Sequence, residues 1–153
     1  MSAKNLIHQV MAEIGPLLEL GAVIESDDGD GWILAIDEHE SVLVELDETE
    51  ERILLSAGAG LPPDDARPRL YEMLLAYNRE WHATGGICMA LEEPGGEVVQ
   101  MLELPVAGLD VARLAQVFVA FLEILTGWCT VVAAQAGAGD RSGESVPDGG
   151  IQV

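Results

Sequence analysis

The sequence is poor in positive charge. Only 7 of its 153 residues are Lys or Arg, against 27 Asp and Glu, which gives a formal net charge of −20 at pH 7. Nucleic-acid phosphates and anionic lipid surfaces are bound mainly by clusters of Lys and Arg. Such a cluster is hard to build from seven cations spread over the chain. The charge balance therefore argues against nucleic acids and membrane surfaces as partners.

Cysteine is scarce as well. Cys88 and Cys129 both lie in apolar runs, and the three histidines are scattered. Two separated cysteines provide neither a disulfide framework nor the ligand spacing of a zinc site. We therefore expect two buried free thiols, which suit a reducing cytoplasm, and no bound metal.

Catalytic motifs are also lacking. The sequence contains no Gly-x-Ser-x-Gly, no phosphate-binding loop and no dinucleotide fingerprint. His82 and Cys88 could act as base and nucleophile, but the alternating apolar residues around Cys88 favour a core thiol. The acidic turn at Asp27, Asp28 and Asp30 does not have the ligand spacing of a calcium loop. We expect neither an enzyme nor a cofactor.

Hydrophobic residues, by contrast, make up 49% of the chain, and the longest apolar stretch spans residues 109–134. Arg113, Gln116 and Glu123 lie near one side of this predicted helix, opposite an apolar stripe. A membrane-spanning helix rarely carries Arg and Glu in its middle. A largely buried helix of a soluble protein, or a helix in an oligomer interface, is favoured over a membrane span.

Apolar residues follow helical spacing in three segments and alternate in five others. The helical segments are 3–14, about 64–82 and about 110–134, and the strands are 32–36, 42–47, 52–57, 87–91 and 98–104. Gly15-Pro16 is predicted to end the first helix, because Pro cannot continue the hydrogen-bond ladder. Residues 17–24 fit either an extended segment or a short helical turn. The first three strands are joined by short acidic links, so they are predicted to be antiparallel.

Predicted helix caps, a predicted loop and the composition of the C-terminal residues set the bounds of one domain. Asp110 is predicted to cap the last helix, Asp64 or Asp65 the second, and residues 57–63 to form a loop. From Gln135 the chain is rich in Gly, Ser, Asp and Ala. We predict one domain over residues 1–134 and a disordered tail over 135–153. The fold class is α+β, in the order α-β-β-β-α-β-β-α, with one antiparallel sheet packed with helices.

The second half resembles the class I type III secretion chaperones, the Tir-chaperone-like family of small acidic bacterial proteins. The similar stretches are the Leu-Leu-x-x-Asn segment ending at Asn78, the strand at 86–91, and the final strand and helix at 98–105, 109–110 and 118–128. The strands over 32–57, Gly60-Leu61-Pro62 and the opening helix occur in the matching order. The likeness covers about residues 3–132.

This resemblance implies a cytoplasmic bacterial homodimer with a role in virulence. It binds the N-terminal region of a secreted effector, keeps it soluble and export-competent, and hydrolyses no ATP. The resemblance also implies a dimer interface built from the second helix and the following strand, at Leu74, Tyr77, Trp81, Ile87 and Met89.

An extended effector chain can add to a sheet edge and place alternate side chains in apolar pockets. The opening helix and the sheet offer Leu6, Val10, Ile33, Val44 and Ile53 as candidate effector-binding residues. Acidic residues around such pockets favour basic effector segments.

The alternative is an acidic inhibitor or immunity-type protein that neutralises a basic enzyme. Its carboxylates would form one contiguous face, and salt would weaken its complex strongly. A chaperone would instead present apolar pockets.

Overall fold

The computed structural model describes residues 1–144, with side chains up to Ala136. Three α-helices pack with one six-stranded antiparallel sheet of strand order β1-β2-β3-β4-β6-β5, which confirms the α+β class. The elements are α1 (Ala3–Leu18), β1 (Ala22–Glu25), β2 (Gly31–Ala35), β3 (Ser41–Asp47), β4 (Arg52–Gly60), a 3-10 turn (Asp64–Ala66), α2 (Arg67–Arg79), β5 (Cys88–Leu91), β6 (Val98–Pro105) and α3 (Val111–Glu144).

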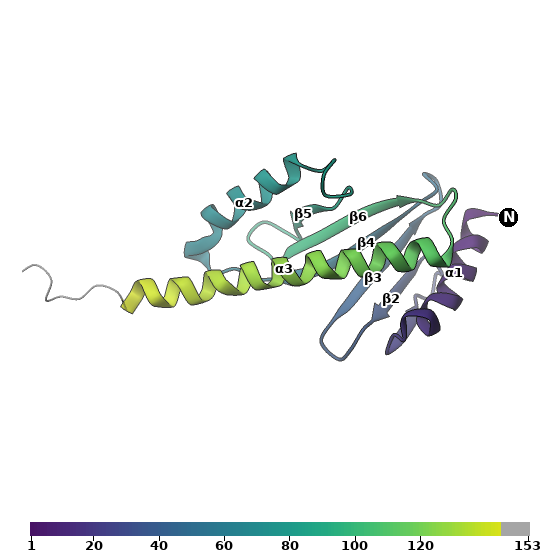
Figure 1. Ribbon diagram of the computed structural model, residues 1–153, viewed down its shortest axis with the longest axis horizontal. Coiled ribbons are helices and arrows are strands. Elements are labelled where there is room, and N and C mark those ends of the chain that lie inside the picture. The colour runs from purple at the N-terminus through teal and green to yellow at the C-terminus, as the bar shows by residue number, and fades with distance from the viewer. Residues whose placement is uncertain (145–153) are drawn as a thin grey trace, which may run out of the picture.

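The sheet has one covered face and one open face. Figure 1 shows α3 running along the sheet, with α1 at its β1–β2 end and α2 beside β5. Along β3 every second side chain is buried, and the side chains between them are exposed, apart from the half-buried Asp47 at the end of the strand. None of the three described helices covers the exposed set. The polar/apolar alternation of the sequence therefore corresponds to a real difference between the two faces.

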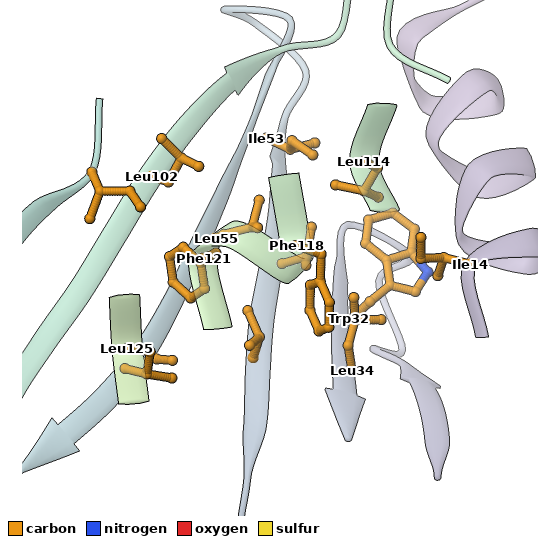
Figure 2. Close-up of a cluster of buried hydrophobic side chains, with 14 of the residues drawn as sticks. Ile14, Trp32, Leu34, Ile53, Leu55, Leu102, Leu114, Phe118, Phe121 and Leu125 are labelled. Atoms are coloured by element: carbon orange, nitrogen blue, oxygen red, sulfur yellow. The ribbon is translucent and has the colours of Figure 1, made fainter. Parts of the chain in front are cut away.

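The core lies between α3, α1 and the covered face. Phe118 and Phe121 of α3 are fully buried over Leu55 and Trp32 of the sheet, as Figure 2 shows. Burying one such side chain contributes about 1.5–3 kcal/mol relative to leaving it in water. The apolar stripe of α3 thus explains why this long helix lies on the sheet.

By length and composition alone, Val111–Ala136 within α3 is apolar enough to cross a membrane, with a mean hydropathy of 2.0. Its stripe of Leu114, Phe118, Phe121 and Leu125 is buried against the sheet. Only 28% of this apolar window is buried, so the helix is not largely buried as predicted.

The first helix is longer than predicted. α1 continues through Gly15 and Pro16 to Leu18, so the predicted stop at Gly15-Pro16 is wrong. Pro removes only one N–H, and the helix ends within a turn, where Glu19 adopts a left-handed conformation (φ 54°) and its N–H bonds the Gly15 and Pro16 carbonyls. The undecided residues 17–24 supply the end of α1 and most of the additional strand β1.

The segment predicted as a loop at 57–63 is largely strand. β4 continues to Gly60, with a register irregularity between Gly58 and Gly60. The Glu97 carboxylate occupies the space where a side chain at residue 58 would lie. Glycine here admits Glu97 rather than breaking the strand.

Two helix boundaries also differ from the sequence prediction. α2 begins at Arg67 without a side-chain cap, so the cap predicted at Asp64 or Asp65 is wrong; Asp64 instead pairs with Arg67 at 2.7 Å. α2 ends at Arg79, before the predicted end near residue 82. The cap predicted for the last helix is confirmed, because the Arg113 N–H donates to Asp110 Oδ1 at 2.7 Å.

α3 extends to Glu144, beyond the predicted helix end near Gln135. The rest of the predicted tail, residues 145–153, lies outside the described residues. Cys88 and Cys129 are free thiols and are half-buried rather than fully buried.

Candidate functional site

A groove of about 830 Å³ lies between α1 and β1. It is lined by His8, Met11, Ala12, Gly15, Pro16, Glu19, Leu20, Val23, Glu25 and Trp32. The α1 residues recur every three or four positions, so they form one stripe that faces β1. A Cβ on Gly15 would lie 3.1 Å from the Val23 side chain, so the missing side chain allows α1 and β1 to approach closely.

The groove runs beside an open sheet edge. Within residues 1–144, β1 pairs with β2 alone. The backbone groups on its other side have no strand partner in the described chain, and such an edge is a template for strand addition. An extended peptide paired with β1 would place alternate side chains over the groove.

The other edge of the sheet is capped by a side chain. The Asn78 amide of α2 donates to the Met89 carbonyl at 2.8 Å and accepts from the Met89 N–H at 2.7 Å. Asn78 therefore occupies the backbone groups of β5 that a neighbouring strand would use. This difference between the edges favours β1 as the site of strand addition.

A polar cluster lies among the lining residues of the groove. The His8 ring lies with Nε2 2.9 Å from the Gly29 carbonyl and Nδ1 3.0 Å from Glu25 Oε1. It also meets Trp32 edge to face, with 5.2 Å between ring centroids. His8 thereby ties α1 to β1 and to the β1–β2 turn.

The open sheet face carries a second apolar surface. Successive strand pairings align one row of side chains across all six strands, in the order Ile24, Ile33, Leu43, Ser56, Met101 and Cys88. Ile24 is 55%, Ile33 42% and Leu43 39% exposed. At the β5 end, Trp81 lies in a shallow pocket with Leu54, Cys88 and Met101. We call these six side chains, together with the neighbouring Trp81 and Leu54, the open-face row.

The predicted effector-binding residues do not form one surface. Val10, Val44 and Ile53 are core residues, Leu6 is half-buried, and Ile33 lies on the open face. None of the five lines the α1–β1 groove. The groove residues Leu20 and Val23 were missed because the pattern of 17–24 was ambiguous. No polar/apolar alternation marked this strand, because Val23 and Ile24 are both apolar.

The predicted dimer residues differ in how deeply they are buried in the protomer. Leu74, Ile87 and Met89 are buried within the protomer. Tyr77 is half-buried against Trp128 of α3, with ring centroids 5.1 Å apart, and burial raises the pKa of its hydroxyl. Trp81 is 51% exposed and stacks with His82.

The remaining polar groups do not build a recognisable reaction centre. Among residues 1–136, whose side chains the structure describes, no group of three or more His, Cys, Asp or Glu is placed to hold a metal ion. The pocket lined by Cys88 contains Glu103 but not His82. Burial raises the pKa of Cys129, and the nearby Glu40 and Glu97 carboxylates raise it further, so this thiol is disfavoured as a thiolate nucleophile.

This fold is shared with solved structures of other proteins, including the following three. The ExsC–ExsE complex matches with a TM-score of 0.72 and 20% identity, over 86% of this chain and 97% of the matched chain. The HopA1–SchA chaperone–effector complex matches at 0.68 and 22%, over 84% and 96%. The type III secretion chaperone SycH of Yersinia pestis, in complex with a fragment of YscM2, matches at 0.59 and 18%, over 78% and 97%.

The sequence comparisons agree with this structural likeness. The family model of the Tir chaperone protein (CesT) family matches residues 9–129. No curated protein sequence matches the chain. The matched range contains most of α1, all six strands, α2 and the part of α3 that packs on the sheet.

Proposed function

The chain belongs to the Tir chaperone protein (CesT) family, and from this premise we propose that it is a type III secretion chaperone that binds the N-terminal region of a secreted effector as a homodimer. Bound effector stays soluble and competent for export. Two of the similar structures are a chaperone–effector complex and a type III secretion chaperone in complex with a stable fragment of another protein, which supports this assignment.

The observation that carries the proposal is the open β1 edge beside the α1–β1 groove. The groove combines backbone groups for strand pairing with apolar side chains such as Met11, Leu20 and Val23. Main-chain hydrogen bonds would supply affinity, and the groove would select alternate side chains. Holding a segment extended in this way requires no catalytic group. We accordingly assign the protein no enzymatic activity, no cofactor and a cytoplasmic location.

The homodimer is proposed to use α2 and the adjoining part of the open-face row. Trp81 is half-exposed beside Leu54, Cys88 and Met101, and Leu75 of α2 is 70% exposed. A second copy covering these side chains would remove apolar surface from water. Tyr77 and Trp81 would lie nearest the partner, while Leu74, Ile87 and Met89 would support them from the core.

The test is native mass spectrometry of the complex that co-purifies with the tagged protein from its native host. Two copies that hold one secreted protein through its N-terminal region would support the proposal. Val23→Asp should then lose the secreted protein, whereas Glu13→Gln, on an exposed part of α1 outside the groove, should retain it. A folded basic enzyme bound one-to-one and released by salt would instead support the inhibitor alternative.

A further inference from the structure

The outer face of α3 is poor in charge and is not covered by the described chain. In Figure 1 this helix lies in front of the sheet, and neither α1 nor α2 passes over it. Only 28% of the apolar window Val111–Ala136 is buried, although its mean hydropathy is 2.0. Exposed positions recur every three or four residues, at Ala112, Gln116, Val119, Glu123, Thr126 and Thr130. A solvent-exposed helix face normally carries many charges, so this face is expected to have a partner.

The side chains of this face are small, and its hydroxyls are satisfied within the helix. Thr126 and Thr130 donate to the carbonyls of Leu122 and Thr126, at 2.9 and 3.0 Å. A Cβ on Gly127 would meet nothing within 4 Å, so no contact in the protomer requires glycine there. Glycine nevertheless destabilises the interior of a helix relative to alanine. Small side chains allow a second helix to approach closely, so the face is suited to helix packing.

The charges of this face are complementary to those of a second copy. Arg113 and Glu123 are the only charged residues of Val111–Ala136, and both are exposed. Neither forms an ion pair within the described structure, and about 15 Å of helix separates them. In an antiparallel pair of α3 helices with a two-fold axis at the level of residue 118, Arg113 of each copy lies opposite Glu123 of the other. This register forms two ion pairs, whereas a register centred on either residue would oppose like charges.

We propose that the outer face of α3 binds α3 of a second copy of this chain, in an antiparallel pair aligned by Arg113 and Glu123. Gln116, Val119 and Ala120 are the exposed residues nearest its centre. The contact is separate from the dimer interface proposed at α2, and a protein that uses both forms assemblies larger than a dimer. The net charge of −20 on each copy opposes association, so the contact is weak and depends on the two ion pairs.

Charge reversal in the full-length protein tests this contact, with sedimentation velocity over a wide range of concentrations. Arg113→Glu and Glu123→Arg each replace two attractive pairs by two repulsive ones, so each should raise the dissociation constant of the contact by about ten-fold. The double variant Arg113→Glu/Glu123→Arg restores opposite charges and should return to within about three-fold of the wild type. The control Glu13→Arg makes the same change in net charge at an exposed position of α1, and it should not weaken the contact.

The outcomes separate this contact from other causes of association. Single reversals that leave association unchanged, or a double variant as weak as either single variant, would overturn the inference. Trp81→Asp should leave the response to charge reversal intact, and a response that disappears with Trp81→Asp would assign it to the α2 interface instead. Binding of the wild type to phosphatidylcholine vesicles without self-association would identify a lipid surface as the occupant and equally overturn the inference. Circular dichroism verifies that each variant is folded.

Discussion

At the scale of single residues, a few polar side chains link the sheet to the neighbouring helices by hydrogen bonds. Asn78 hydrogen-bonds both backbone groups of Met89 and so occupies the outer side of β5. Gln100, the only buried polar residue of the described core, links β6 to α3. Each acts through hydrogen bonds between a helix and a strand.

We predict that Asn78→Ala lowers the free energy of unfolding by about 1–3 kcal/mol, because it leaves the N–H and carbonyl of Met89 without their partners. Chemical denaturation followed by circular dichroism measures this loss. The neighbouring Arg79→Ala, at an exposed position with no such contact, is the control. Equal stability of the two variants would contradict the role assigned to Asn78.

For Gln100, in contrast, we expect that replacement by an apolar residue of similar size changes the free energy of unfolding only slightly. Its amide donates to the Phe121 carbonyl at 2.9 Å, while its Oε1 has no hydrogen-bond partner within the described structure. Gln100→Leu removes one hydrogen bond and also removes a buried unsatisfied oxygen, so we expect a change of less than about 1 kcal/mol. Gln100→Glu places an unpaired charge in the same site and should destabilise far more at pH 7. Thermal melts of both variants distinguish these outcomes.

At the scale of elements, turns and helix ends depend on short-range hydrogen bonds. The β2–β3 turn is an example. Asp37 Oδ1 accepts from the His39 N–H at 2.7 Å and from the Glu40 N–H at 2.8 Å, and these bonds lower the pKa of Asp37. A carboxyl with a lowered folded-state pKa contributes stability above its unfolded pKa and loses it as the pH falls through the folded value.

The corresponding prediction concerns acid sensitivity. Asp37→Ala should lower stability at pH 7 and should differ little from the wild type at a pH below the folded pKa of Asp37, where the carboxyl is protonated. Amide hydrogen exchange at His39 and Glu40 reports the turn directly. Glu38→Ala is the control, because Glu38 occupies the same turn without these bonds. A pH-independent difference between Asp37→Ala and the wild type would show that the ionised carboxylate is not what stabilises the turn.

At the scale of the whole molecule, the chain combines strong negative charge with apolar surface left on the sheet. A formal charge of −20 keeps such a surface soluble by repulsion between copies. Two surfaces of the sheet remain available, the α1–β1 groove and the open-face row. We assign the first to the effector segment and the α2 end of the second to the partner subunit.

Trp81→Asp should convert the proposed dimer to a folded monomer, because it places a carboxylate among the apolar side chains of that interface. Light scattering of dilute protein, in which the weaker α3 contact is dissociated, gives the mass, and circular dichroism checks the fold. Val119→Asp provides a control, since Val119 is similarly exposed on α3, outside the α2 interface. A Trp81→Asp protein that folds and keeps the mass of a dimer would exclude this interface. Leu74→Asp is less informative, because Leu74 is buried and its replacement would disturb the packing of α2.

Much of the fold follows from the sequence alone, because periodicity is a local property. The stripe Leu114, Phe118, Phe121 and Leu125 predicts the helix on the sheet, and Val42, Val44 and Leu46 predict a strand with one buried face. The ends of α1 and β4 were less predictable, since Pro usually ends a helix and Gly usually weakens a strand, yet α1 continues through Pro16 and β4 through Gly58. At these positions the free-energy cost of Pro in a helix or Gly in a strand is offset by tertiary contacts, which the spacing of residues in the sequence does not show.

The candidate site depended on tertiary structure. By itself, the sequence determined the fold class, the excess of acid, the absence of familiar catalytic motifs and the resemblance to secretion chaperones, all of which depend on composition and local pattern. Only the folded chain decided that β1 exists, that it forms one edge, that Asn78 caps the other edge, and that His8 meets Glu25. These features join residues separated by 11 to 17 positions, as Asn78 and Met89 or His8 and Glu25 are, and no local period encodes such contacts. Their formation depends on burying the stripes of α1 and α3 against the same face of the sheet.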